Sequence, residues 1–171
     1  MKLFGDGKAP FQGFIDGVRV VLRKVPLVGE LFKYGRKNSL WMVHLTTGCC
    51  SPEYAAVSGS GFDWERFGTL PWAAMRQSDV LLIEGQVAEK MARVVRRVYD
   101  QMPDPKYVIA TGNCAISGGF YYDSYSMTMG VDRIVPVDVF VPGCPPRPED
   151  WIDGLRLLQR KIGQEEGYPH Q

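Results

Sequence analysis

The hydrophobic pattern of the chain changes near residue 40. Over residues 11–34, apolar residues recur at helical spacing while Asp and Arg residues fall off their face, which predicts amphipathic helix. Pro26 should break or kink this helix, because proline lacks the N–H group that a helix interior requires. A second apolar stripe begins directly after Pro26, so amphipathic N-terminal helices are expected ahead of the main domain.

Beyond residue 38, short apolar runs alternate with helical patterns. Four runs predict strands, at Leu40–Leu45, Asp79–Gly85, Tyr107–Thr111 and Ile134–Val141. Helical spacing and end signals predict helices over Ala88–Met102 and from Pro148 to Gly163. Strands that alternate with helices are typical of an α/β domain with a mostly parallel sheet.

Each of the four cysteines follows the end of a predicted strand. Cys49 and Cys50 come after the first strand, Cys114 after the third and Cys144 after the fourth. Because the carboxyl ends of parallel strands meet at one edge of the sheet, we expect the four thiols to lie together there.

Several kinds of cysteine chemistry remain open at this point. A disulfide framework is typical of short secreted chains, and a zinc site usually shows Cys-x-x-Cys spacing, which this sequence lacks. Buried structural cysteines are a third option, and a four-thiolate iron–sulfur site is the fourth. Glycines beside the cysteines favour the iron–sulfur site, since they let backbone N–H groups approach sulfur. Candidate counter-cations are Arg66, Arg76 and Arg147, and local backbone strain is expected at the adjacent Cys49 and Cys50.

Composition and charge narrow the class of protein. The 171 residues suit one globular domain, and a net charge of +1 argues against a nucleic-acid partner bound by bulk charge. Residues 1–40 carry eight Lys or Arg and three Asp or Glu, a net of +5, whereas the remainder is net −4. This split indicates either a docking segment for an anionic surface or partner, or a solvated basic face. The sequence shows no secretory signal and no apolar run long enough to span a bilayer.

A series of runs spans about residues 35–162, including GRKNSLW, FDWERFG, RQSDVLLIEG, KYVIATGNCAISGG, YYDSYS and VPVDVFVPGCPPRPE. These runs resemble the quinone-site iron–sulfur subunit (the B subunit) of respiratory complex I, or NADH-quinone oxidoreductase. They are also similar to the small subunit of membrane-bound, energy-converting [NiFe] hydrogenases. The tandem cysteines resemble complex I, since the hydrogenase branch usually has Cys-x-x-Cys there.

The resemblance implies a fold, a cofactor and a set of partners. It implies a flavodoxin-like domain at residues 39–163, preceded by a basic docking segment at 1–38 and followed by a tail at 164–171. One [4Fe–4S] cluster would be bound by Cys49, Cys50, Cys114 and Cys144 and would pass electrons to quinone, with ion translocation in membrane subunits. The implied partners are a large catalytic subunit, an upstream iron–sulfur donor subunit and membrane-arm subunits. The chain would lie peripherally at the cytoplasmic face of the cell membrane.

The chain alone would not be a complete enzyme. It has no nicotinamide fingerprint of the G-x-G-x-x-G kind after a strand, so it would act as one subunit of an oxidoreductase complex. No catalytic residue is assigned to it, because general acid or base catalysis at the electron acceptor would be carried out by the partner subunit.

Some residues depart from the complex I pattern. Gly61-Phe62-Asp63 replaces the usual Arg-Tyr-Asp run, segment 69–75 is altered, and His44 is unusual at its position. These departures keep a second hypothesis open, in which the chain serves a hydrogenase-like or sulfur-reducing complex with a non-quinone acceptor. A third hypothesis is a stand-alone flavodoxin-like binding domain with four structural cysteines.

Overall fold

The computed structural model describes residues 26–164, so the helix expected before Pro26 lies outside the described residues, as does all of the expected tail 164–171 except Gln164, which ends the last helix. The chain divides into two compact units between Arg36 and Lys37, and each is described by itself. Helix α2, Pro26–Asn38, begins at the proline, where a missing N–H costs nothing. None of the described helices is long and apolar enough to cross a membrane.

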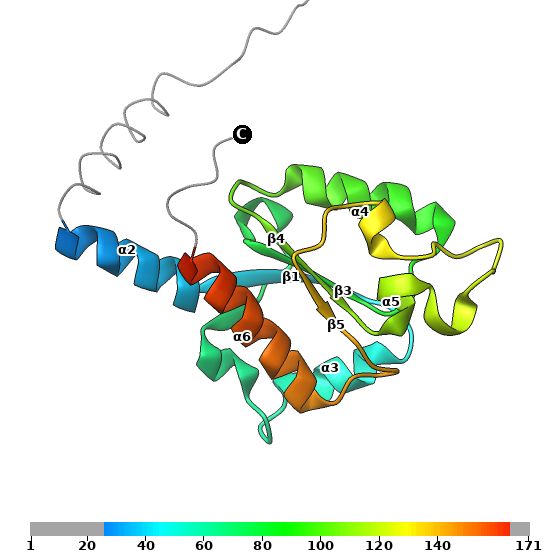
Figure 1. The fold of residues 1–171 in the computed structure, drawn as a ribbon, viewed down its shortest axis with the longest axis horizontal. Helices are drawn as coiled ribbons and strands as arrows, with labels where there is room; N and C mark the ends of the chain where they lie inside the picture. The colour runs from blue at the N-terminus through cyan, green and yellow to red at the C-terminus, as the bar shows by residue number, and fades with distance from the viewer. Residues whose placement is uncertain (1–25, 165–171) are drawn as a thin grey trace, which may run out of the picture. The chain divides into compact units, whose positions relative to one another are not determined.

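The second unit is built on one parallel sheet of five strands in the order β2-β1-β3-β4-β5 (Figure 1). The strands are β1 Leu40–Thr46, β2 Thr69–Pro71, β3 Val80–Glu84, β4 Tyr107–Thr111 and β5 Val139–Val141. This order is that of flavodoxin-like folds, in which ligands bind where the strand order reverses, beside β1 and β3. The expected α/β, flavodoxin-like fold is therefore confirmed.

Helices cover both faces of the sheet (Figure 1). On one face lie α3, Cys50–Ser58, and α6, Pro148–Gln164; on the other lies α4, Glu89–Gln101. The short α5, Asn113–Ser117, follows β4, and 3-10 turns occupy Trp64–Phe67, Met75–Gln77, Gly119–Tyr121 and Val131–Arg133. Two apolar cores result, one on each side of the sheet.

The core beneath α3 and α6 is rich in aromatic rings. Trp64, Trp151 and Tyr54 pack together with ring centroids 5.6–6.3 Å apart. Both tryptophans are almost fully buried. This cluster fixes α3 and α6, which begin close to cysteines, against the same face of the sheet.

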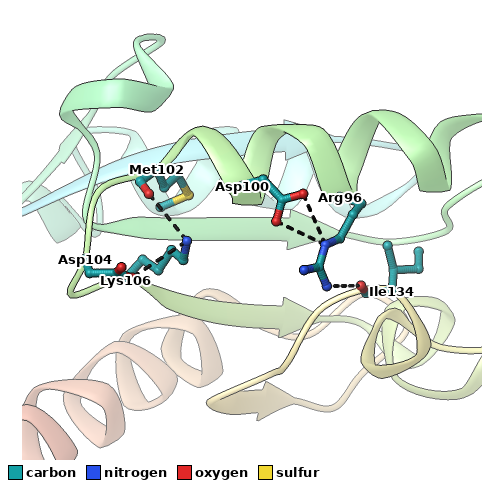
Figure 2. Close-up of polar contacts among 6 residues, drawn as sticks. All are labelled: Arg96, Asp100, Met102, Asp104, Lys106 and Ile134. Atoms are coloured by element: carbon teal, nitrogen blue, oxygen red, sulfur yellow. Dashed lines mark hydrogen bonds and ion pairs between the residues drawn. The ribbon is translucent and has the colours of Figure 1, made fainter. Parts of the chain in front are cut away.

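Polar contacts beside α4 contribute little to the stability of the fold (Figure 2). Arg96 on α4 pairs with Asp100 and donates to the carbonyl of Ile134, while Lys106 donates to the carbonyl of Met102. The Arg96–Asp100 pair is more than half exposed, and such pairs contribute about 0–1 kcal/mol. Packing of the two cores, rather than these contacts, holds the layers together.

Three expectations about the elements need correction. The strand predicted at Ile134–Val141 is only Val139–Val141, because a 3-10 turn ends just before Ile134 and Pro136 has no N–H for a ladder bond. Helix α3 and the edge strand β2 were not predicted. Met91, expected on the buried face of α4, has 40% of its surface exposed.

Candidate metal centre

The four cysteines lie just beyond the carboxyl ends of three strands. Cys49 precedes α3 and Cys50 is its first residue, Cys114 lies in α5 after β4, and Cys144 lies in the loop after β5. All four are free thiols, so the disulfide alternative is not realised here. The expected gathering of the cysteine-bearing loops at one edge of the sheet is thus what the topology shows.

Backbone hydrogen bonds tie these loops to one another. The N–H of Thr47 donates to the carbonyl of Glu84 at 3.1 Å, which joins the loop after β1 to the end of β3. Asn113 and Gly143 bond reciprocally: the Asn113 N–H donates to the Gly143 carbonyl at 2.8 Å, and the Gly143 N–H donates to the Asn113 Oδ1 at 3.0 Å. The segments that carry Cys114 and Cys144 are therefore held at a fixed spacing.

Burial and the charges of the other three cysteines act on the thiol of Cys50. Burial first, and then the charges of Cys49, Cys114 and Cys144, raise the pKa of the Cys50 thiol to about 12. Charges act on one another in this way only at short range inside a protein. The thiol form of Cys50 is therefore favoured over its thiolate.

Glycine makes room for the buried thiol. A Cβ added at Gly112 would lie 2.7 Å from the Sγ of Cys50, and the backbone φ of Gly112 is +89°, which disfavours other residues. Gly112 is therefore required both by its backbone conformation and by the sulfur that lies against it.

We expect Gly112→Ala to destabilise the purified chain by about 1–3 kcal/mol, the usual cost of a non-glycine residue in a strained region. The new methyl group would also displace Cys50 and weaken whatever the thiols bind. Chemical denaturation measures the first effect. Gly61→Ala is the matched control, because a Cβ there meets nothing within 4 Å and its φ is not positive. Equal stability of the two variants would contradict the tight fit at Gly112.

The strain expected at the adjacent cysteines is not present. Cys49 has ordinary right-handed helical angles, φ −75° and ψ −10°, and the positive φ of +66° falls on Gly48 instead. The start of a helix thus accommodates two neighbouring cysteines without backbone distortion. Helix α3 was missed at the level of sequence, although its buried residues, Cys50, Tyr54 and Val57, have helical spacing.

Two of the three arginines proposed as counter-cations have contacts or positions away from the cysteine-bearing loops. The guanidinium of Arg66 lies over the ring of Phe67, and Arg76 lies in the turn that leads into the amino-terminal end of β3. Arg147 follows Cys144 by three residues, and its backbone N–H donates to the carboxylate of Asp150 at the start of α6. No arginine contributes to the pKa shift of Cys50.

The altered segment 69–75 lies at the opposite end of the sheet from the cysteines. Pro71 pairs with Met42, and the N–H of Trp72 donates to the Met42 carbonyl, so this segment runs beside the amino-terminal half of β1. Its departures from the complex I pattern are therefore remote from the cysteine-bearing ends of the strands.

His44 belongs to a buried polar group that sequence reasoning identified only in part. Its ring stacks on Tyr54 with centroids 4.7 Å apart, and its Nδ1 lies 3.7 Å from a carboxylate oxygen of Glu84. The Glu84 side chain is completely buried, and burial raises its pKa to about 8. Burial lowers the pKa of His44, so both groups favour their neutral forms.

The buried carboxyl group should make the stability of the purified chain depend on pH. Unfolding returns Glu84 to water, where its pKa has the ordinary value of 4.5. Between pH 4.5 and about 8 the unfolded chain releases this proton while the folded chain keeps it. We therefore expect the contribution of Glu84 to stability to be largest below this window and to be lost as pH rises through it, by up to about 1.4 kcal/mol per pH unit for one proton. The lowered pKa of His44 acts in the opposite direction, since its contribution is lost as pH falls.

Urea unfolding at several pH values measures this slope. Glu84→Gln should remove it, because an amide does not titrate. Glu149→Gln, at an exposed acid on α6, is the matched control and should keep it. The same slope in Glu84→Gln and in the parent chain would contradict the burial of an uncharged carboxyl group at this position.

Similarity to known proteins agrees with this geometry. Residues 48–158, which include all four cysteines, match the family described as NADH ubiquinone oxidoreductase, 20 Kd subunit. An NADH-quinone oxidoreductase B subunit of Salinispora tropica is 50% identical over 137 residues, covering 80% of this chain and 73% of that protein. The corresponding B subunit of Campylobacter jejuni is 47% identical over 152 residues, covering 89% of both chains.

A solved structure is also similar. It is the membrane-bound sulfane sulfur reductase, an archaeal respiratory membrane complex, of which one chain is 42% identical with a TM-score of 0.75. The match covers 81% of this chain and 78% of that one. The resemblance drawn from the sequence runs is thereby confirmed. The chain belongs to the family of the 20 kDa subunit of NADH ubiquinone oxidoreductase and is a component of an oxidoreductase complex.

Proposed function

We propose that this chain is the electron-transfer subunit of a complex I-like respiratory complex. Cys49, Cys50, Cys114 and Cys144 bind one [4Fe–4S] cluster, the last of a relay, which passes electrons singly to quinone. The observation that supports this most is that all four cysteines follow the carboxyl ends of parallel strands, in loops that are bonded to one another or to a neighbouring strand.

The donor set fits a cluster better than a single ion. Within residues 26–164, no three His, Cys, Asp or Glu side chains lie close enough to hold one metal ion. A cluster tolerates wider spacing between thiols, since several irons and sulfides lie between them, and four thiolates are its usual ligands. Gly112 has no side chain, and a Cβ there would strike the sulfur of Cys50. Glycine at this position therefore leaves room for the Cys50 sulfur at the proposed centre.

The chain's own groups support a negatively charged centre. Cys50 is the first residue of α3, so it lies at the positive end of the helix dipole, which favours negative charge. Cys50 and Cys114 are buried, whereas Cys49 and Cys144 are exposed. The exposed pair gives the centre one side that faces outward, where an electron donor or acceptor on another subunit can approach.

The partners follow from the family. We propose a large catalytic subunit that forms the quinone site with this chain, an upstream iron–sulfur subunit as donor, and membrane-arm subunits that translocate ions. The net charge of +5 over residues 1–40 supports docking of this segment at the cytoplasmic face of the membrane arm.

A second acceptor is favoured by one observation. The similar solved chain comes from a sulfane sulfur reductase, so a sulfur compound is the alternative to quinone. The altered segment 69–75 does not favour this alternative, because it runs beside the amino-terminal half of β1, whereas the cysteines follow the carboxyl ends of the strands.

Rapid-freeze electron paramagnetic resonance (EPR) of the intact, reduced complex tests the proposal. We expect a [4Fe–4S] signal that disappears within one turnover after a quinone analogue is added. Reoxidation by polysulfide or protons but not by quinone would support the alternative. Absence of any cluster signal would overturn the assignment of the four cysteines.

A further inference from the structure

A positively charged cavity lies beside α4, apart from the proposed metal centre. Its volume is about 600 Å³, and three arginines line it: Arg93 and Arg96 from α4, and Arg133 from the 3-10 turn Val131–Arg133. Glu89 is the only carboxylate among its lining residues, so the lining carries a net charge of +2. Hydroxyl groups of the segment 124–128 complete the polar part of the wall.

Two of the three arginines have no carboxylate partner within the part of the chain that the structure describes. Arg96 pairs with Asp100 on its own helix and donates to the carbonyl of Ile134 (Figure 2). Arg93 and Arg133 are exposed and form no ion pair with residues 26–164. Their guanidinium groups are therefore available to an anion, which each could bind through two parallel N–H bonds.

Exposed aromatic side chains extend this surface beyond the cavity. They lie on the segment that follows α5: Phe120 is 89% exposed, Tyr122 70% and Tyr125 99%. Tyr125 also lines the cavity, together with Met127 and Met129. Aromatic residues, Met and Arg are the types enriched where proteins bind one another, and Tyr and Arg are frequent among the residues that dominate affinity.

Hydrogen bonds hold this segment on the amino-terminal end of α4. Ala88 and Met127 form an antiparallel bridge, and the N–H of Glu89 donates to the Ser126 carbonyl at 2.9 Å. Thr128 donates to the carbonyl of Val87 from both its N–H, at 2.8 Å, and its hydroxyl, at 2.9 Å. The exposed rings thus sit on a fixed backbone, so a partner would not have to order that backbone on binding.

We propose that the cavity and the segment 120–129 form a docking surface for an acidic segment of another subunit of the complex. Asp or Glu carboxylates of that segment pair with Arg93 and Arg133, and its apolar side chains cover Phe120, Tyr122 and Tyr125. The inference requires that the chain is a component of a complex, which its family establishes, and it does not depend on the proposed cluster.

Other occupants account for less of this surface. A free phosphate ion would satisfy the arginines but would leave the aromatic rings exposed. A second copy of the chain would bring the same net positive lining against itself, and like charges across an interface oppose association. An acidic protein segment supplies both the negative charge and the apolar cover.

Charge reversal in the intact complex tests the role of the arginines. We expect the double variant Arg93→Glu and Arg133→Glu to weaken association with one subunit on the order of 100-fold, because each attraction becomes a repulsion. Native mass spectrometry of the diluted complex would then show a subcomplex that lacks this subunit. Arg97→Glu with Arg160→Glu is the matched control, since both residues are exposed and neither lines the cavity. A complete complex from the first variant would overturn the proposal.

Photo-crosslinking in the otherwise unaltered complex gives a second test, which holds even if the double variant fails to assemble. A photoreactive phenylalanine at position 125 should form a crosslink to a peptide of another subunit that contains Asp or Glu residues. A crosslink to a second copy of the chain, to lipid or to a peptide without acidic residues would overturn the proposal, as would no crosslink. Absence of a cluster EPR signal in the parent complex would refute the proposed function and leave this inference standing.

Discussion

Replacement of Cys114 by alanine is expected to remove or convert the [4Fe–4S] signal of the complex while the chain still folds. Cys114 is 6% exposed in the short helix α5, and a free cysteine packs like a small apolar residue. Alanine therefore keeps most of the local packing and costs about 1 kcal/mol of stability, the centre of the range for point mutations. A ligand, however, is not replaceable by a methyl group, so electron transfer should fall to background.

Two measurements separate this loss of ligation from unfolding. EPR and an iron and sulfide assay report the cluster, and the unfolding midpoint reports the fold. Ser117→Ala is the matched control, since Ser117 lies on the exposed side of the same helix. A Cys114→Ala complex with a normal signal would show that this thiol is structural and is not a ligand of the proposed cluster.

Short apolar runs made the site predictable. Val80–Glu84 and Tyr107–Thr111 are buried at every position, so an unbroken apolar run identifies them as central parallel strands. Once these strands are placed, the rule for parallel sheets places Cys114, which follows the second of them, and the other cysteines lie after the strands that flank this pair, β1 and β5. No such signal exists for β2. It has only three residues, one of them a proline, and it is the edge strand of the sheet.

The buried polar group could not be predicted in the same way. Nothing local distinguishes Glu84 from a carboxylate that ends a strand and turns to solvent. Its burial accompanies the packing of α3 on this side of the sheet, with Tyr54 stacked on His44. These contacts join residues that are far apart in the sequence, and the pattern of a single sequence gives no information about such contacts.

The second large effect concerns the aromatic core that supports the site. Trp151 lies in the first turn of α6, shortly after the loop that carries Cys144, and its Nε1 donates to the carbonyl of Pro146 at 3.3 Å. Its ring packs against Trp64 and Tyr54 and is 2% exposed. Trp151→Ala should therefore destabilise the purified chain by about 3–5 kcal/mol, as large-to-small changes of buried aromatic residues do.

The loss of Trp151 should also weaken binding of the proposed cluster. The indole N–H bond to Pro146 holds the chain two residues after Cys144, so its removal should loosen one proposed ligand as well as the core. Trp151→Phe separates the two contributions, because it keeps a ring in the core but loses this hydrogen bond, a change of about 1 kcal/mol for the bond itself. Urea unfolding of the purified chain measures stability, and EPR of the complex measures the cluster.

A matched control lies on the same helix. Leu157 is 50% exposed, so Leu157→Ala removes apolar surface without opening a cavity and should change stability by no more than about 0.5 kcal/mol. If Trp151→Ala behaved like this control, the aromatic cluster would not be what fixes α6 against the sheet. If stability fell while the cluster signal stayed normal, the position of Cys144 would depend on its bonds to the α5 loop alone, through Asn113 and Gly143. The expected joint loss reflects one physical link: the same indole fills the core and anchors the loop that carries Cys144, a proposed ligand.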